Sequence, residues 1–264
     1  MDLKLSGKKA LITGSTAGIG FAAAQHLLKE GVEVYLNGRH PESTLKAVEK
    51  LKAAVPQARV APFVADFNKP AEVDKQLNAI SSIDLLINNV GIYTSKSFFD
   101  TTAIDWSSQF QVNIMSGVQL AKKFLPSMLK KNWGRILFIS SECAYLVPSD
   151  MISYSATKAA VHAVSKGLAH LTRGTAVTVN TLVPGSTLTE GAKKFIASKA
   201  AAEQKNSEEI ERLFFQAERP NSLLERFANV EEVATTIAYL CSPLSSATNG
   251  SVIKVDGGSS GGIL

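Results

Sequence analysis

Two residues in the middle of the chain, Tyr154 and Lys158, have the side-chain types and the spacing for acid–base chemistry. If their segment is helical, they lie one turn apart on the same face and can reach a shared ligand. A tyrosine hydroxyl loses its proton near about pH 10. A neighbouring ammonium stabilises the phenolate and brings that pKa closer to neutral pH. Because Tyr-x-x-x-Lys is frequent by chance, an ordinary pair on a helix surface is the alternative.

A glycine-rich segment near the N-terminus has the features of a site for an anionic cofactor. It reads TGSTAGIG from Thr13 to Gly20 and lies between a strand-like stretch and a helical one. Gly14 permits a tight turn, while Gly18 and Gly20 let a pyrophosphate approach the helix N-terminus. Free N–H groups and the helix dipole favour an anion there. The spacing is GxxxGxG and not the GxGxxG fingerprint, so an ordinary strand–helix turn is the alternative.

The residues after the next two predicted strands bear on which dinucleotide is bound. An NAD site usually carries Asp or Glu about 20 residues past the glycines, to hold the ribose 2′-hydroxyl. Here the second strand ends in Asn37-Gly38-Arg39, with no acid. Arg39 can pair with a 2′-phosphate, so NADP(H) is favoured and NAD(H) stays possible. Asp66, after the third strand, can accept a hydrogen bond from adenine. A solvated Arg39 and a turn-capping Asp66 are the alternatives.

The hydrophobic pattern predicts the scaffold for these residues, a doubly wound parallel α/β sheet. Short apolar runs alternate with amphipathic helical stretches, and some runs are apolar throughout, as in parallel strands covered on both faces. Ligands of such sheets bind beyond the carboxyl ends of the strands. No linker or repeat divides the chain, so we expect one domain over residues 1–264. The predicted strands are Lys9–Thr13, Glu33–Leu36, Arg59–Val64, Asp84–Ile87, Arg135–Ser140, Thr175–Leu182 and Ser251–Val255.

Composition argues against other classes of protein. The chain has 264 residues, of which 45% are hydrophobic and 19% charged, as in a globular enzyme. Lys and Arg number 28 against 23 Asp and Glu, but they are scattered, so we expect no nucleic-acid groove. The N-terminal residues have no cleavable apolar segment and no uncharged apolar run reaches about 18 residues, so we expect a cytoplasmic protein without membrane attachment. The 2 cysteines and 4 histidines form no ligand pattern, so no metal site is expected.

A series of motifs in order resembles the short-chain dehydrogenase/reductase family, in particular its 3-oxoacyl-carrier-protein reductases. These motifs are TGxxxGxG from Thr13, Asn88-Asn89-Val90-Gly91, Asn113, Ser141, Tyr154-x-x-x-Lys158 and Pro184-Gly185. The resemblance covers nearly the whole chain and ends in Val255-Asp256-Gly257-Gly258. Val90 departs from the family's usual Asn-Asn-Ala-Gly, which puts local packing in question. The resemblance implies a Rossmann fold of about seven strands with helices on both faces.

The resemblance also implies hydride transfer between a nicotinamide cofactor and a carbonyl or alcohol. Tyr154 would exchange the proton with the substrate oxygen, Lys158 would hold the nicotinamide ribose, and Ser141 would orient the substrate. Asn113 would lie in a long helix and bind a water that links Lys158 to solvent, and Asn88 would brace the central sheet. The expected cofactor contacts are Gly14, Ser15, Thr16, Gly18, Ile19, Gly20, Arg39, Asp66, Phe67, Asn89, Gly91, Tyr154, Lys158, Pro184 and Gly185, with Thr187 and Thr189 at the carboxamide.

Residues 186–227 form a connection long enough for a substrate-binding lid. Their apolar residues predict an amphipathic flap, or alternatively only core-facing helix positions. Glu142 and Cys143 follow the predicted serine and are candidates to line the pocket. Assembly into a homotetramer, or a dimer, is implied by the resemblance. The helix bearing Tyr154 offers small residues for close packing, namely Ala156, Ala159, Ala160, Ala163 and Gly167.

The sequence thus predicts an NADP(H)-dependent ketone reductase or related alcohol dehydrogenase that acts on a small molecule. A sugar or polyol dehydrogenase that uses NAD(P) is an alternative within enzymes. A regulatory protein that binds the cofactor without turnover is the alternative of another class.

Overall fold

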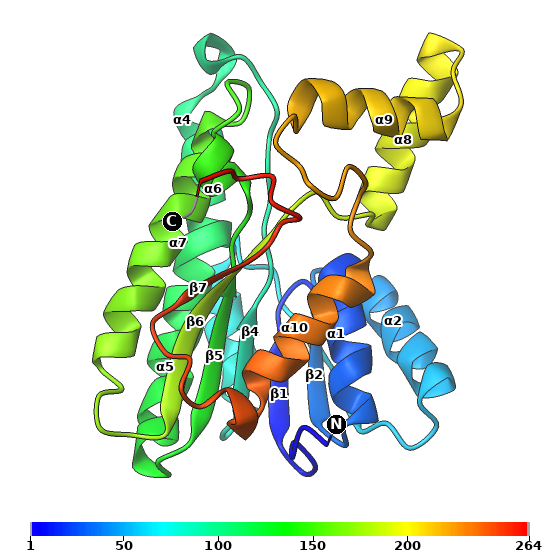
Figure 1. Cartoon of the computed structure of the whole chain (residues 1–264). Coiled ribbons are helices and arrows are strands. Elements are labelled where there is room, and N and C mark those ends of the chain that lie inside the picture. Colours follow the sequence, from blue (N-terminus) through cyan, green and yellow to red (C-terminus); the bar gives the residue numbers. More distant parts are fainter. Residues whose placement is uncertain (1, 263–264) are drawn as a thin grey trace.

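The computed structural model describes residues 2–262, which form a seven-stranded parallel sheet between layers of helices (Figure 1). The strands lie in the order β3-β2-β1-β4-β5-β6-β7, and every neighbouring pair is parallel. This confirms the predicted doubly wound α/β fold. The strands are β1 (Lys9–Ile12), β2 (Glu33–Gly38), β3 (Val60–Val64), β4 (Leu85–Asn88), β5 (Gly134–Ile139), β6 (Val177–Pro184) and β7 (Val252–Val255).

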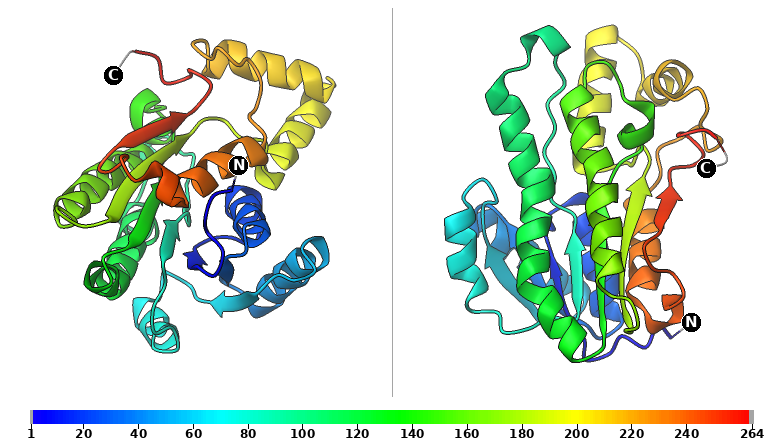
Figure 2. Two further views of the ribbon diagram at one scale, coloured as in Figure 1. Left: turned by 60° about the horizontal axis from the view of Figure 1, so that its bottom comes forward. Right: turned by 90° about the vertical axis from the view of Figure 1, so that its left-hand side faces the viewer.

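Helices cover both faces of the sheet, which explains why its strands are apolar along their length. One layer contains α1 (Gly18–Lys29), α2 (Pro41–Ala54) and α10 (Val230–Cys241), and the other contains α3 (Pro70–Leu77), α5 (Ser116–Lys130) and α7 (Ile152–His170) (Figure 2). Successive strand residues alternate between the two cores. Ile12 packs with α1 and α10, while Leu11 packs with α5.

The strand order reverses between β1 and β4, and this reversal places the ligand site. The chain builds β2 and β3 on one side of β1, then crosses over to add β4, β5, β6 and β7 on the other. In open parallel sheets a crevice opens at such a switch point, beyond the carboxyl ends of the strands. The shorter elements are η1 (Phe98–Asp100), α4 (Ala103–Phe110), η2 (Gln111–Met115), α6 (Cys143–Leu146) and η3 (Pro243–Ser245).

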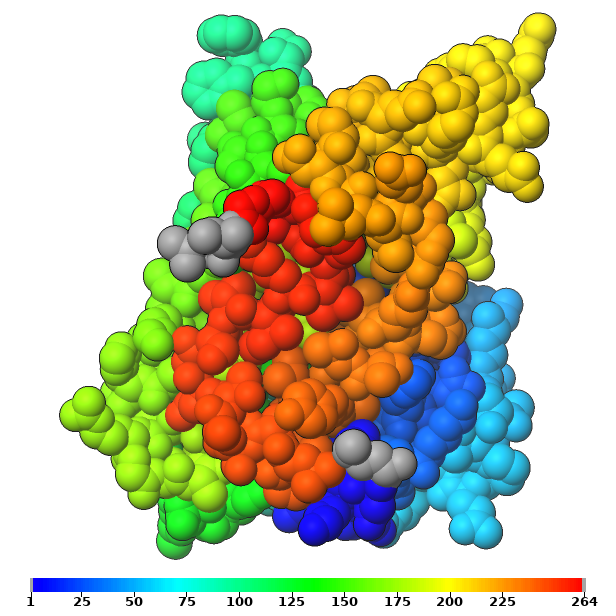
Figure 3. Space-filling model, viewed as in Figure 1, coloured from blue at the N-terminus to red at the C-terminus, as the bar shows by residue number. Residues whose placement is uncertain are grey.

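Two helices, α8 (Glu190–Glu203) and α9 (Ser207–Glu218), rise beyond this edge of the sheet. They carry a small core of their own that includes Ile196, Phe215 and Phe227. Leu223, by contrast, is 87% exposed. The apolar residues of this segment are therefore divided between core-facing and open positions. Figure 3 shows a notch at the top of the molecule between the α8–α9 arm, in yellow and orange, and the green arm beside it, and the two arms meet below this notch.

Candidate active site

The turn after β1 has the backbone that its glycines were predicted to allow. Gly14 and Gly18 both have φ of +58°, a left-handed conformation that residues with a Cβ rarely adopt. A Cβ on Gly14 would also lie 2.9 Å from the Cα atom of Val90. The loop therefore needs glycine at Gly14 for its conformation and for its close approach to the loop after β4.

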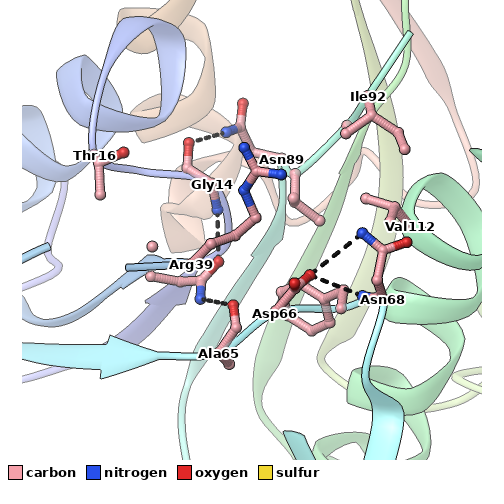
Figure 4. A pocket seen from close by; sticks show the side chains of 14 residues that line it. Gly14, Thr16, Arg39, Ala65, Asp66, Asn68, Asn89, Ile92 and Val112 are labelled. Atoms are coloured by element: carbon pink, nitrogen blue, oxygen red, sulfur yellow. Dashed lines mark hydrogen bonds between the residues drawn. The ribbon is translucent and has the colours of Figure 1, made fainter. Parts of the chain in front are cut away.

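Side chains from β2 and from the loop after β4 hold this turn in place. The amide N–H of Gly14 donates to Oδ1 of Asn37 at 2.9 Å, and Nδ2 of Asn89 donates to the carbonyl oxygen of Gly14 at 2.9 Å (Figure 4). Ser15 is fully buried, and its hydroxyl donates to the carbonyl of Ile12 at 2.7 Å. Ser15 and Asn89 thus shape the loop with their side chains.

A cavity of about 270 Å³ opens beside this loop at the switch point. Arg39 and Asp66, which follow β2 and β3, line it, and Asp66 also accepts a hydrogen bond from the backbone N–H of Asn68 at 3.0 Å. Asp66 therefore caps a turn and faces the cavity, so both of its predicted roles are compatible. The lining residues are Gly14, Thr16, Asn37, Gly38, Arg39, Ala65, Asp66, Phe67, Asn68, Asn89, Val90, Gly91, Ile92 and Val112.

An acidic side chain from α8 lies at the N-terminus of α1. The amide N–H of Gly18 donates to Oε2 of Glu190 at 3.0 Å. Helix α1 has no side-chain cap of its own and no acid in its first turn, so its first N–H groups and its dipole favour an anion. The Glu190 carboxylate stands where a phosphate group could bind. The site therefore fits the pyrophosphate of a dinucleotide.

Tyr154 and Lys158 lie one turn apart on α7, as predicted. The ammonium of Lys158 is buried, lies 5.6 Å from the centre of the Tyr154 ring, and donates to the carbonyl of Ile139 at 2.8 Å. A Cβ on Gly91 would come within 3.2 Å of Nζ of Lys158. Since Gly91 also lines the cavity, the ammonium lies directly beside the predicted cofactor site.

Asn113 lies in η2, a π-helical turn between α4 and α5. Its Oδ1 accepts from the backbone N–H of Ile92 at 2.8 Å, and its Nδ2 donates to the Ile92 carbonyl and to the Thr157 hydroxyl, both at 2.9 Å. The side chain thus joins the loop after β4 to α7. The predicted long helix is present but carries this local widening, a feature often found at functional sites.

Burial dominates the proton affinities of the central pair. It raises the pKa of the Tyr154 hydroxyl well above its usual 10, while a contact with Ser141 acts in the opposite direction. Burial lowers the pKa of Lys158 to about 8. The expectation of a Tyr154 pKa closer to neutral is wrong for the protein without cofactor, because desolvation of the phenolate raises that pKa. The Tyr154 hydroxyl is therefore a neutral donor at neutral pH.

The comparisons agree with this geometry. A family model described as short chain dehydrogenase matches residues 8–200. The chain belongs to that family. This short-chain dehydrogenase is 42% identical over 258 residues to the oxidoreductase YvaG of Bacillus subtilis, and the match covers 98% of each chain. It is 33% identical to the 3-oxoacyl-[acyl-carrier-protein] reductase FabG of Aquifex aeolicus, covering 98% of this chain and 99% of that one.

Solved structures place this short-chain dehydrogenase in the same fold. The L-sorbose reductase of Gluconobacter frateurii, in complex with NADPH and L-sorbose, superposes with a TM-score of 0.93 at 29% identity and covers 100% of both chains. The agreement extends over the α8–α9 segment as well as the sheet, because no part of either chain is left out.

Other predicted residues of the dehydrogenase lie around the same edge. Pro184 ends β6 and is followed by Gly185, where a Cβ would lie 2.7 Å from the Cα of Asp256. Thr187 is largely buried and donates to the Gly185 carbonyl at 2.9 Å, and Thr189 caps α8. Three further predicted residues can offer a cofactor mainly backbone atoms. Gly20 has no side chain, and the side chains of Ile19 and Phe67 pack in the two cores.

The structure adds contacts at Gly20 and Asn88 that the sequence did not indicate. Gly20 is buried, and a Cβ there would lie 2.5 Å from Nδ2 of Asn89, so packing of the loop already requires this glycine. Asn88 was expected to brace the sheet, but its side-chain nitrogen and oxygen are buried and find no hydrogen-bond partner among residues 2–262. The bracing role of Asn88 stays a prediction, whereas the neighbouring Asn89 holds the turn after β1 with its side chain.

Sequence reasoning did not find Glu190, Ser186 or Arg219. No sequence pattern marks Glu190 as a site residue, apart from its position directly after Thr189. Arg219 is 77 positions from Glu142, with which it pairs, and a contact at that separation depends on the fold. Over residues 2–262, no three His, Cys, Asp or Glu side chains are grouped to hold a metal ion, and no helix has the length and apolar character to cross a membrane.

Proposed function

We propose that this dehydrogenase reduces ketones with NADPH, and oxidises the corresponding alcohols with NADP⁺, using Tyr154 as the proton donor or acceptor. The observation that carries the proposal is the position of Tyr154. Its hydroxyl is close to Ser141, and its neighbour Lys158 adjoins Gly91 in the wall of the cavity. A ketone between Ser141 and Tyr154 would therefore lie next to a dinucleotide in that cavity.

Residues of the glycine loop and the strand ends would hold the cofactor. The turn from Gly14 to Gly20 and the N-terminus of α1 fit the pyrophosphate, as the Glu190 contact indicates. Arg39 is exposed at the cavity wall and can pair with a 2′-phosphate, and the solved L-sorbose reductase contains NADPH. These observations favour NADP(H) over NAD(H). Asp66 would accept from the adenine, and Lys158 would donate to the nicotinamide ribose.

The cofactor supplies or takes up the hydride. The protein's part is to hold the carbonyl in place and to stabilise the negative charge that develops on its oxygen. Ser141 would donate a hydrogen bond to that oxygen, and Tyr154 would donate its proton. The Tyr154 hydroxyl, whose pKa is raised, is protonated at neutral pH in the protein without cofactor, and this is the form that donates during reduction. Asn113 would position Lys158 through Thr157, and its predicted part in a water relay stays a prediction.

We also propose that residues 186–227 act as a substrate lid, since α8 and α9 stand over the open edge of the sheet. Association into a homotetramer, or a dimer, is proposed through α7 and the α4–α5 region. In support, Ala159, Ala163 and Gly167 are exposed on α7, and Ile104 on α4 is 78% exposed. A cytoplasmic location and the absence of nucleic-acid binding remain predictions from composition.

The sugar or polyol alternative has a specific observation in its favour, the TM-score of 0.93 with L-sorbose reductase. The 3-oxoacyl alternative has the sequence similarity to FabG. The regulatory alternative is less well supported, because Ser141, Tyr154 and Lys158 are all present and close together.

One experiment tests the proposal directly. NADPH absorbance is followed with the purified protein and a panel of simple ketones, ketoses and an acetoacetyl thioester, and NADP⁺ is tested with the matching alcohols. Turnover of at least one ketone supports the proposal. Tight NADPH binding without oxidation across the whole panel would instead favour the regulatory alternative.

A further inference from the structure

A buried carboxylate lies next to the predicted catalytic serine. Glu142 follows Ser141 directly, and its side chain is only 3% exposed. Its Oε1 accepts from the Ser186 hydroxyl at 2.7 Å and from Nε of Arg219 at 2.5 Å. Its Oε2 is also buried but has no hydrogen-bond partner among residues 2–262. A buried carboxylate oxygen left without a donor is costly, so it marks a place where a donor is expected.

The partners of Glu142 place this oxygen at the substrate end of the site. Ser186 follows the end of β6, where the α8–α9 segment begins, and Arg219 follows the end of α9. Glu142 therefore lies where both ends of the proposed lid meet the edge of the sheet. Its backbone N–H donates to the carbonyl of Pro184 at 2.9 Å, which fixes Glu142 at the end of β6, directly after Ser141.

The charge balance limits which donor would complete the site. The Arg219 guanidinium, 10% exposed, already neutralises the Glu142 carboxylate. An ammonium group on the substrate would add an unbalanced positive charge in a buried place, whereas a hydroxyl would donate a proton without adding charge. A buried ion pair is weak evidence for stability, since apolar residues of similar volume can often replace it without loss. A hydroxyl donor would therefore complete the site without changing its charge.

We propose that Glu142 is a specificity-determining residue whose Oε2 accepts a hydrogen bond from a second hydroxyl of the substrate. The substrate is then a polyhydroxy ketone or the matching polyol, in preference to an acyl chain or a simple ketone. This inference rests on the proposed function, because it assumes that the ketone lies at Ser141 and Tyr154. Arg219 and Ser186 are positioning residues that fix the carboxylate.

The test compares the wild-type protein with E142Q, which keeps the shape of the side chain but cannot offer two acceptor oxygens. The substrates are L-sorbose and 2-hexanone, which have six carbons each but differ in their hydroxyls. We expect kcat/KM for L-sorbose to fall about 10- to 100-fold in E142Q, and that for 2-hexanone to change less than about threefold. E208Q, on an exposed position of α9, is the matched control and should behave as wild type.

Two further measurements keep the outcomes distinct. Thermal unfolding and NADPH affinity of E142Q show whether the variant is intact. Calorimetric titration of the NADP⁺ complex with L-sorbose gives a binding readout that needs no turnover, and we expect weaker binding in E142Q. An equal fall of activity on both ketones, or a wild-type preference for 2-hexanone or an acetoacetyl thioester over L-sorbose, would overturn the inference alone. Failure of every ketone to oxidise NADPH would instead overturn the proposed function.

Discussion

The carboxylate of Glu190 accepts a hydrogen bond from the backbone N–H of Gly18 at 3.0 Å, and so places a negative charge at the N-terminus of α1. The same N–H groups are the ones expected to bind the cofactor's pyrophosphate. Carboxylate and phosphate cannot both accept from Gly18 in this arrangement. If the pyrophosphate binds at Gly18 as proposed, it would displace Glu190, and α8, which begins at this residue, would then respond to cofactor binding.

Glu190→Gln removes the competing charge while keeping the length of the side chain. A charge near a helix terminus contributes about 0.3–1 kcal/mol, so we expect the Kd for NADPH to fall about two- to fivefold. Fluorescence titration with NADPH measures this change, and Glu208→Gln is the control. An unchanged or higher Kd in Glu190→Gln would mean that Glu190 does not compete with the phosphates.

Tyr154→Phe removes the proton donor and little else. Proton transfer by a positioned side chain contributes typically 10²–10⁴-fold, so we expect kcat to fall by about 10³-fold or more with NADPH affinity within about threefold of wild type. Steady-state rates with the best ketone and a fluorescence titration give the two values. A variant that keeps most of its activity would exclude Tyr154 as the acid.

The sequence was sufficient to predict the strands of the sheet and which residues follow their carboxyl ends. Apolar runs bounded by turns predicted every strand to within about two residues, because burial on both faces leaves a clear signal in each run. The position of Tyr154 one turn before Lys158 followed from helix geometry alone. These features are local, and local patterns can be read from one sequence.

Long-range contacts could not be predicted in the same way. The Glu142–Arg219 pair and the Glu190–Gly18 hydrogen bond join segments 77 and 172 positions apart, and only the packed fold brings them together. The pKa of Tyr154 was predicted in the wrong direction for a related reason. The sequence shows that Lys158 is near but does not show how far the fold removes the two groups from water, and this desolvation decides the direction of both pKa shifts.

Arg39→Ala should change the choice of cofactor. A hydrogen bond to a charged group contributes about 1.5–3 kcal/mol, so NADPH binding should weaken about 10- to 100-fold, while NADH, which has no 2′-phosphate, should be nearly unaffected. Titration of both cofactors with the wild type and the variant gives the ratio. Equal losses for the two cofactors would show that Arg39 does not bind the phosphate.

Lys158 should leave a signature in the pH dependence of stability of the protein without cofactor. Its pKa is about 8 in the folded protein and about 10.5 when unfolded, so between these values the unfolded state binds more protons. The unfolding free energy of wild type should therefore rise with pH, relative to Lys158→Met, by up to about 1.4 kcal/mol per pH unit. Denaturant titrations at pH 7.5, 9 and 10 measure the difference. Lys122→Met, at an exposed position, should show no such trend, and a flat difference for Lys158→Met would contradict the burial of its ammonium.

Gly20 and Gly167 give a matched pair for the packing of the glycine loop. A Cβ on Gly20 would lie 2.5 Å from Nδ2 of Asn89 and 2.7 Å from the Gly14 carbonyl oxygen, whereas a Cβ on Gly167 meets nothing within 4 Å. Gly20→Ala should therefore lower the unfolding free energy by about 1–3 kcal/mol and weaken NADPH binding, since the loop must shift. Gly167→Ala, in a helix, should raise the unfolding free energy of the single subunit by about 0.5–1 kcal/mol. If Gly20→Ala is as stable as Gly167→Ala and binds NADPH as wild type does, the hydrogen bonds of Asn89 do not hold the loop.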